Sequence, residues 1–559
     1  MKKVFLFFLL IILPIILFSQ REVREVLRLV NDRGEIYTAI LRSDLKKLQN
    51  PYSLPGFDQI RNDSIFLYLN KKNISFFQNN MKILHFPAPP STRIRVEMSD
   101  DRQEVLGGNA YPTYPLYLEI MEYFRDSFPD VCSIDTIGYS ANDRALLAAR
   151  MSRTGNEPGD VPIAFYSSTI HGDETAGYVF MLMLIDHFLN GSNPEAQRIL
   201  DEMIVIINPL ANPDGTYHTS DSTVFGATRG NARGIDLNRN FPDPESGNHP
   251  DGNTWQPETK AMMRYMERFP PAISANFHSG AEVVNYPFDT WVRKHADDEW
   301  FHFISEEYAL LARSLKPGYM SEFSNGVTNG YLWYEVDGGR QDYVTYFLRG
   351  RETTIELSDT KLLPEDELIP FWLANRASMI NYLKQGTYGI HGKISDTLSL
   401  ENIKAEVRVR NHDKLNSSVF SDSVTGNFFR YLKGGNYDLE IEAAGYRIAR
   451  INNVNVSDYK RKQLLVKMIP RDMLPGINEI TVGPNPFRQE TTVFAGLKQA
   501  DYLFFKIYDV FGNLIYDRFR YFTAGYHEHQ ISFSAAPGVY LLRITSSFEE
   551  EDFRIIKLE

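Results

Sequence analysis

Hydrophobic residues in the middle of the chain form short continuous runs that alternate with longer amphipathic stretches. Four of these runs occupy residues 162–169, 203–208, 272–277 and 353–357. Continuous apolar runs of this length are typical of strands covered on both faces. The segment GYVFMLMLIDHFL, which follows the first run, predicts an apolar helix. Strands that alternate with helices from about 105 to 386 predict an α/β domain whose mixed sheet is mainly parallel and flanked by helices.

The pattern changes on both sides of this region. Residues 387–470 and 480–559 hold short β segments divided by glycine and asparagine turns, and each stretch is about 80 residues long. That size predicts two small all-β sandwich domains. Residues 21–90 mix charged helical stretches with a strand-like run at 65–69 and end in a proline cluster, which is typical of a linker.

The first 20 residues have the layout of a signal peptide. Lys2 and Lys3 precede an apolar run from Val4 to Phe18, and Pro14 within that run disfavours a lasting membrane span. No later segment approaches the roughly 20 apolar residues that a spanning helix needs. We therefore expect an exported protein whose mature form has no transmembrane span.

Composition narrows the possible partners. The chain has 71 acidic and 59 basic residues, a net charge of −12, and shows no basic stripe, which argues against nucleic acid as a partner. Its one cysteine, Cys132, excludes an intramolecular disulfide and any cysteine-based metal site, and we expect a buried, inert thiol there. Export without disulfides fits the envelope or exterior of a bacterium.

Chemically capable side chains follow the predicted strands. His171 and Glu174 come after the first run, His278 follows the third, and Glu356 lies within the fourth. Ligands of open α/β sheets bind beyond the carboxyl ends of strands, so these residues are expected to converge on one crevice. Two histidines and a glutamate form a common catalytic zinc set with one position left for water. The competing interpretation is a polar loop histidine and a glutamate favoured by a helix N-terminus.

Five motifs carry a resemblance to a known family. They are HGDE at 171–174, RGNARGIDLNRNFPD from 229, FHSGAEVVNYPFD ending at 289, NGYLWYEVDGGRQDY at 329–343 and ETTIELSD at 352–359. In order and spacing they resemble the zinc metallocarboxypeptidases over about 280 residues. The chain looks closest to the regulatory carboxypeptidases N, E and D, because NYPFD is paired with GGxQD and a β domain follows.

The resemblance implies one catalytic zinc site per domain. His171, Glu174 and His278 would bind Zn2+, and Glu356 would be the general base that activates the zinc-bound water. Arg229 would polarise the scissile carbonyl, although it is also compatible with a solvated loop charge. A purely structural role is harder to assign to Glu356, because it lies in an otherwise apolar strand and a buried unpaired carboxylate is energetically costly.

The same resemblance implies how a substrate is held. Asn238 and Arg239 would bind the terminal carboxylate, and Tyr334 would close over the peptide end. Asp289 and Gln341 would line the side-chain pocket, where a carboxylate suits a terminal lysine or arginine. Tyr334 is also compatible with a packing aromatic, and Asp289 with a turn residue.

One position departs from the pattern of the close relatives. Ser279 stands where they usually have glycine, which is similar to the digestive carboxypeptidases and leaves the details of the subsites open.

The flanking segments carry weaker or separate resemblances. Residues 21–90 resemble bacterial propeptides, the alternative being a module that stays attached. Residues 387–470 look like a transthyretin-like domain. VGPNPFRQETTV, FKIYDVFGNLIYD and PGVYLLRI, within 480–559, resemble the sorting domain of type IX secretion substrates, the alternative being an adhesion-type β module. The sorting domain implies recognition by type IX secretion machinery and transport through the periplasm to the exterior or surface of a gram-negative bacterium.

These features predict a secreted zinc carboxypeptidase that removes C-terminal Lys or Arg from peptides and proteins. A peptidoglycan peptidase on the same scaffold and a catalytically inactive peptide-binding module are the alternatives. The second alternative is weakened because the metal ligands, the carboxylate-binding residues and the general base are all present. The natural substrate and the oligomeric state stay open.

Overall fold

The computed structural model describes residues 94–559 apart from 154, 192, 398, 471–476 and 548, and before them 26, 28, 35–41, 57–61, 64–70, 74, 84 and 85. The predicted signal peptide, residues 1–20, lies outside the described residues, as does most of 21–90. In the part of the chain that is described, no helix is long and apolar enough to cross a membrane. The chain divides into two compact units, the first holding 1–395, 401–442 and 448–466 and the second 396–400, 443–447 and 467–559.

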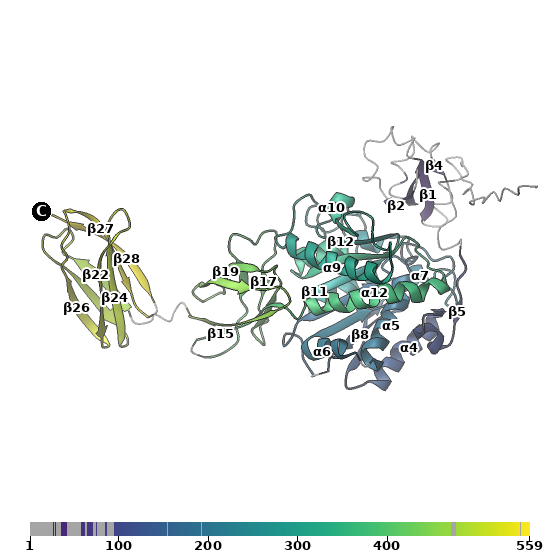
Figure 1. The fold of residues 1–559 in the computed structure, drawn as a ribbon, viewed down its shortest axis with the longest axis horizontal. Coiled ribbons are helices and arrows are strands. Elements are labelled where there is room, and N and C mark those ends of the chain that lie inside the picture. The colour runs from purple at the N-terminus through teal and green to yellow at the C-terminus, as the bar shows by residue number, and fades with distance from the viewer. Residues whose placement is uncertain are drawn as a thin grey trace, which may run out of the picture. The chain divides into compact units, whose positions relative to one another are not determined.

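An eight-stranded mixed sheet forms the centre of the first unit, in the order β13-β12-β14-β11-β9-β10-β8-β7 (Figure 1). Its strands are β7 (Cys132–Tyr139), β8 (Ala145–Met151), β9 (Ile163–Ser168), β10 (Ile204–Asn208), β11 (Ile273–His278), β12 (Ala281–Tyr286), β13 (Val327–Asn329) and β14 (Arg351–Ser358). The four central strands β10, β9, β11 and β14 are parallel. Antiparallel pairs lie on both sides of them. The predicted mixed sheet and its four apolar strands are confirmed.

Helices cover both faces of this sheet, which explains the continuous apolar runs. Ile204 and Ile206 of β10 join a core with α8 (Pro257–Arg268), while Val205 and Ile207 join the core on the opposite face. The helices of that second core are α4 (Tyr114–Ser127), α5 (Ala176–Asn190), α6 (Pro194–Glu202), α9 (Asp298–Leu315) and α12 (Glu365–Gln385). Each fully buried aliphatic side chain stabilises the fold by about 1.5–3 kcal/mol. Shorter helices are α3 (Arg102–Leu106), α7 (Pro213–Thr216), α10 (Gly330–Trp333) and α11 (Arg340–Asp342).

Two small sheets follow α12 and are built from strands β15–β21. Their orders are β18-β15-β21 and β17-β16-β19-β20. The strands are β15 (Gly389–Asp396), β16 (Glu406–Val409), β17 (Val419–Phe420), β18 (Asn427–Arg430), β19 (Gly435–Glu442), β20 (Ala449–Val456) and β21 (Arg461–Met468).

A buried ionic cluster centred on Asp297 joins β14 to the β15–β21 segment. The Asp297 carboxylate accepts from Arg351 at 2.7 Å, from Arg430 at 2.7 Å and from His412 at 2.8 Å. Arg430 also contacts Asp413. Although burial alone would raise it, the pKa of Asp297 is held well below its usual range by Arg430 and Arg351. Breaking a buried pair of this kind is strongly destabilising, because a charge is left without its partner.

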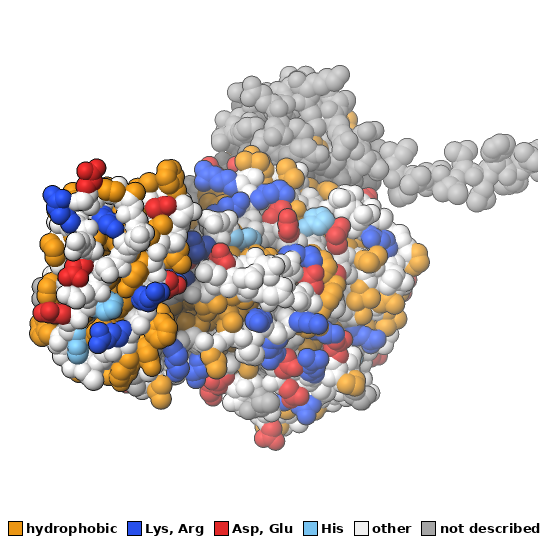
Figure 2. All heavy atoms as spheres, turned by 60° about the vertical axis from the view of Figure 1, so that its left-hand side comes forward, with side chains coloured by type: hydrophobic (Ala, Val, Ile, Leu, Met, Phe, Trp, Pro, Cys, Tyr) orange, Lys and Arg blue, Asp and Glu red, His pale blue; other side chains and the backbone are white. Residues whose placement is uncertain are grey.

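The second unit contains two further sheets, in the orders β22-β23-β26 and β25-β24-β27-β28. Their strands are β22 (Ile477–Gly483), β23 (Thr491–Leu497), β24 (Asp501–Tyr508), β25 (Leu514–Phe522), β26 (Gly525–Ile531), β27 (Gly538–Thr545) and β28 (Glu550–Lys557). Side chains from both sheets share one core, as Val493 and Phe505 illustrate. Figure 2 shows hydrophobic side chains on the face of this unit turned to the viewer, and the exposed aromatic residues of β24 and β25 include Tyr502, Phe519 and Tyr521.

Candidate metal centre and active site

Three side chains, two from the loop between β9 and α5 and one from β11, converge at the carboxyl ends of the central strands. His171 lies in the loop after β9, Glu174 precedes α5, and His278 ends β11. The Glu174 carboxylate lies 2.9 Å from His171 Nδ1 and 2.9 Å from His278 Nδ1. One ligand atom from each residue lies within 4.8 Å of the other two. Two imidazoles and a carboxylate in this arrangement fit a catalytic zinc site.

Neighbouring side chains orient both imidazoles. Asp236 Oδ1 lies 3.1 Å from His171 Nε2, and the Asn276 amide lies 2.8 Å from His278 Nε2, so each ring directs Nδ1 toward Glu174. Such outer contacts set the ring orientation of metal-binding histidines. Burial lowers the pKa of His278 to about 4, which keeps this imidazole neutral, the form in which histidine binds a metal.

The residues predicted to bind the scissile carbonyl and the terminal carboxylate of a substrate lie beside this metal centre. Arg229 is buried, donates to Asp236 Oδ2 at 2.9 Å and lies 3.5 Å from Glu174 Oε1. Asn238 Oδ1 accepts from the backbone N–H of Arg340 at 2.9 Å, which fixes its amide. Arg239 is not among the residues that line the cavity, and it donates to the carbonyl oxygen of Asn238 at 2.9 Å.

Asp289 and Gln341, which were predicted to line the side-chain pocket of the substrate, form a second cluster of polar side chains. Asp289 Oδ1 accepts from Gln341 Nε2 at 2.8 Å and from Asn285 Nδ2 at 3.1 Å. Among the described residues, Asn285 Oδ1 and Gln341 Oε1 are buried and have no hydrogen-bond partner. Burial raises the pKa of Asp289 to about 7. A Cβ at Gly330 would come within 1.6 Å of Asp289 Oδ1, so only glycine leaves room for this carboxylate.

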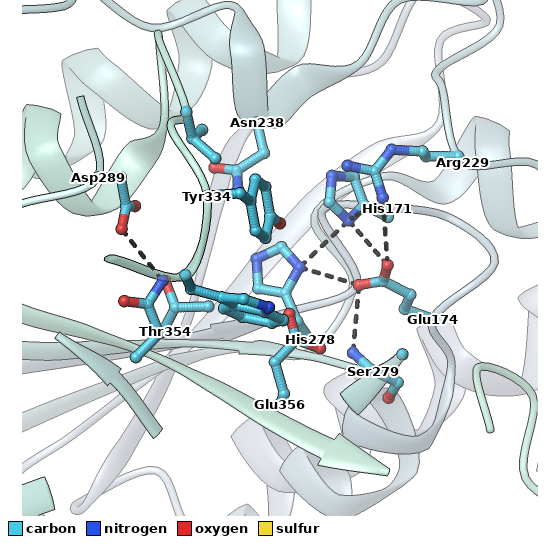
Figure 3. A pocket seen from close by; sticks show the side chains of 14 residues that line it. His171, Glu174, Arg229, Asn238, His278, Ser279, Asp289, Tyr334, Thr354 and Glu356 are labelled. Atoms are coloured by element: carbon cyan, nitrogen blue, oxygen red, sulfur yellow. Dashed lines mark hydrogen bonds and ion pairs between the residues drawn. The ribbon is translucent and has the colours of Figure 1, made fainter. Parts of the chain in front are cut away.

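A small cavity of about 30 Å³ connects the two groups. Figure 3 shows His171, Glu174 and Arg229 on one side of it and Asp289 on the other, with Tyr334 also directed inward. Glu356 lies on β14, where it is the register partner of His278, and its side chain lines the same cavity. The crevice expected from the strand ends is therefore present.

Two residues that were not expected from the sequence contact the centre. The Lys361 ammonium lies 3.2 Å from Glu174 Oε1 and 3.6 Å from Asp173 Oδ2. Together with His171 it holds the pKa of Glu174 well below its usual range, against the effect of burial. Tyr68 of β3 (Ser64–Asn70) donates to Asp173 Oδ2.

Sequence reasoning also missed Asn285 and Asp342, although both belong to motifs that the sequence shows. Asn285 opens the NYPFD motif, and Asp342 closes the GGxQD motif next to Gln341. Asp342 accepts from the backbone N–H groups of Asp289 and Thr290, both at 2.9 Å, and so joins the two motifs.

Fold and site together define an α/β enzyme with a candidate zinc centre of two histidines and a glutamate. Residues 117–378 match the zinc carboxypeptidase family, Peptidase_M14. Carboxypeptidase M of Mus musculus is 32% identical over 351 residues, which cover 59% of this chain and 78% of that protein. The human carboxypeptidase N catalytic chain is 33% identical over 364 residues, covering 58% and 78%. The chain belongs to the zinc carboxypeptidase family.

One further relative is much longer than this chain. Human carboxypeptidase D is 34% identical over 344 residues, 58% of this chain, but the match spans only 24% of that longer protein. Family membership makes the protein a zinc metallocarboxypeptidase with Zn2+ as its cofactor, and His171, Glu174 and His278 are the candidate ligands.

Proposed function

We propose that the enzyme removes C-terminal lysine or arginine from peptides and proteins. The acceptor oxygens around Asp289 carry this proposal, because those of Asn285 and Gln341 are buried without a donor among the described residues. An ammonium group offers three donors and a guanidinium five. A buried acceptor left without a donor costs about 1–3 kcal/mol, so a cationic side chain is favoured over an apolar one.

The chain's own residues supply positioning and proton transfer. Asn238 and Arg239 would bind the terminal carboxylate of the substrate, the guanidinium by paired hydrogen bonds. Arg229 would donate to the scissile carbonyl oxygen and stabilise the negative charge that develops there. Tyr334, half-buried at the edge of the cavity, would close over the bound end.

Glu356 would act as the general base. Its carboxylate lines the cavity beside His278, so it can accept a proton from the attacking water and return it to the leaving amine. His171, Glu174 and His278 would hold Zn2+, which when bound polarises a carbonyl oxygen and lowers the pKa of a coordinated water.

The decisive experiment measures release of the last residue from peptides that differ only there. Two forms are supplied with zinc, residues 21–559 and residues 91–559, and the second lacks the segment proposed below as a propeptide. Each form is given peptides ending in Lys, Arg, Phe, Leu or Glu. Release confined to Lys and Arg, and abolished by a chelator, is the expected result. Release of Phe or Leu instead would refute the basic pocket. No release at all would favour wall peptides as substrates or a binding role.

We also propose that residues 21–90 act as a propeptide. The support is Tyr68, which contacts Asp173 next to Glu174 while its ring lies 5.1 Å from the Lys361 ammonium and 5.8 Å from the Arg229 guanidinium. A segment held at this place would obstruct access to the metal centre. Cleavage near the proline cluster at 86–90 would release it.

The remaining segments complete the proposal. Residues 105–386 would be the catalytic domain, 387–470 a transthyretin-like β-sandwich, and 480–559 a β-sandwich sorting domain read by type IX secretion machinery. With a signal peptide at 1–20, these would take the protein through the periplasm to the outside or the surface of a gram-negative cell. Shared cores and motif order support these assignments.

A further inference from the structure

A second cavity, of about 410 Å³, lies at the opposite ends of the central strands. It is lined by Ile163 at the start of β9, Ala272 just before β11 and Arg351 at the start of β14. Its other side is formed by the β15–β21 segment, including Phe420 and Phe429. The six residue-to-residue steps from Ala272 to His278 span roughly 20 Å at about 3.3 Å each, so the cavity is separate from the metal centre.

The size and the apolar lining of this cavity suit a small molecule. Sites for such ligands occupy about 300–1,000 Å³ and combine a hydrophobic lining with a few polar groups. Val161, Leu348, Val419 and Phe420 supply apolar surface here. Phe420 is 45% exposed, so part of its ring is open to a ligand in the cavity.

Two of the cavity's cations are already neutralised. Arg351 pairs with Asp297 at 2.7 Å, and Arg349 pairs with Glu406 at 2.9 Å while its guanidinium lies 4.3 Å from the centre of the Phe420 ring. These contacts fix the position of the aromatic ring that lines the cavity.

Two other cationic side chains, Arg268 and Lys404, also line the cavity. Among the residues that the structure describes, Arg268 and Lys404 form no salt bridge; they lie over the rings of Phe269 and Phe420 at 5.0 Å and 5.7 Å. The carboxylates that line the cavity are engaged elsewhere. Asp422 accepts from the backbone N–H groups of Val424 and Thr425, and Glu267 accepts from Tyr343. The lining therefore combines apolar surface with two cations that have no salt bridge among the described residues and two carboxylates whose oxygens already accept hydrogen bonds.

We propose that this cavity binds a small amphipathic anion: a flat apolar body against Phe420, Leu348 and Val161, with a carboxylate, phosphate or sulfonate paired to Arg268 or Lys404. The lining favours this class of ligand over two others. A cationic ligand would meet carboxylates whose oxygens already accept hydrogen bonds from Tyr343, Val424 and Thr425, whereas an anion would meet Arg268 and Lys404, which have no salt bridge among the described residues. A purely polar anion would leave the apolar lining in water. The proposal does not depend on which C-terminal residue the enzyme removes.

The test uses 1-anilinonaphthalene-8-sulfonate as the probe and residues 21–559 as the protein. Its fluorescence titration is compared with that of N-phenyl-1-naphthylamine, which has the same rings without the sulfonate. Exposed charge pairs contribute up to about 1 kcal/mol each. The Arg268→Gln/Lys404→Gln variant should thus bind the sulfonate probe about tenfold more weakly, equivalent to about 1.4 kcal/mol. Its affinity for the neutral probe should not change.

A matched control removes the same charge from α8 and from the β15–β21 segment at positions outside the cavity. Arg264 lies on α8, one turn before Arg268, and Lys462 lies on β21; both are exposed. Arg264→Gln/Lys462→Gln should bind the sulfonate probe like the wild type. Ser423→Glu, at an exposed position lining the cavity, should weaken binding by adding a negative charge. Equal affinity in both double variants, or wild-type affinity that is the same for the two probes, would overturn the proposal.

Discussion

His278 and Glu356 are register partners on the parallel strands β11 and β14. A candidate zinc ligand and the proposed general base therefore lie side by side at the carboxyl ends of these two central strands. Backbone hydrogen bonds between neighbouring strands fix this relation, and no flexible loop separates the two residues. Catalytic groups placed on strands in this way are held more firmly than groups on loops.

Replacing Glu356 by Gln should abolish turnover while zinc stays bound. General bases typically contribute about 10²–10⁴-fold to a rate, so kcat should fall by about that factor. Steady-state kinetics and metal analysis of the same preparation measure both quantities. Glu367→Gln, at an exposed position of α12, is the control and should behave like the wild type. Unchanged turnover in Glu356→Gln would refute its role as base.

Replacing Asp289 by Asn should remove the preference for basic residues. Hydrogen bonds to charged groups contribute about 1.5–3 kcal/mol, so kcat/KM for peptides ending in Lys or Arg should fall roughly 10- to 150-fold. Release of Phe or Leu should not fall. The comparison needs the same peptide series for both proteins, and a uniform decrease across all peptides would point to a structural effect instead.

The buried Asp289 predicts a pH dependence. Burial raises its pKa to about 7, so the carboxylate that pairs with a cationic side chain is present above that pH and is protonated below it. For Lys peptides, kcat/KM should therefore rise as pH increases through about 7, a profile that reports the free enzyme. In Asp289→Asn this limb should disappear. A limb that persists in the variant would belong to another group.

Tyr68 should lower the activity of the form that retains residues 21–90. If its contact with Asp173 holds the N-terminal segment over the metal centre, Tyr68→Ala should increase kcat/KM of residues 21–559 toward the value of residues 91–559. Tyr68→Phe keeps the ring and removes only the hydroxyl, so it should give a smaller increase. Equal activity of the long and short forms would show that the segment does not inhibit.

Asp297 should contribute strongly to stability. Asp297→Asn leaves the buried Arg351 without its counter-charge and leaves Arg430 paired with Asp413 alone, and breaking a buried pair costs about 3–5 kcal/mol. Thermal or urea unfolding measures the loss. Asp458→Asn removes a partly exposed pair with Lys433 and should cost about 1 kcal/mol or less. Similar losses in the two variants would contradict the importance of the cluster.

The central sheet was predictable because its strands are covered on both faces. Runs such as MIVIIN leave little choice other than a buried strand, and β10 occupies Ile204–Asn208 as expected. The candidate metal ligands could be predicted for the same reason, since His171, Glu174 and His278 each lie after or at the end of such an apolar run. The rule that ligands bind at carboxyl strand ends then placed them together.

The missed contacts depend on long-range packing. Lys361 follows β14 in a segment without any sign of function, and only the fold brings its ammonium to Glu174. Asp297 and Arg430 are 133 residues apart and belong to regions with different hydrophobic patterns. Pairings across such separations leave no local periodicity, so the joining of the β15–β21 segment to β14 could not be read from the sequence.

The Asp297 cluster limits how far this chain can be truncated while keeping enzyme activity. Arg351 begins the strand that carries Glu356, and its partner Asp297 is shared with Arg430. A protein truncated after α12 would lack Arg430, and the remaining charges of this cluster would be exposed to water at the start of β14, the strand that carries Glu356. We therefore expect the shortest active form to extend through β21, to Met468, with the β15–β21 segment as part of its structure.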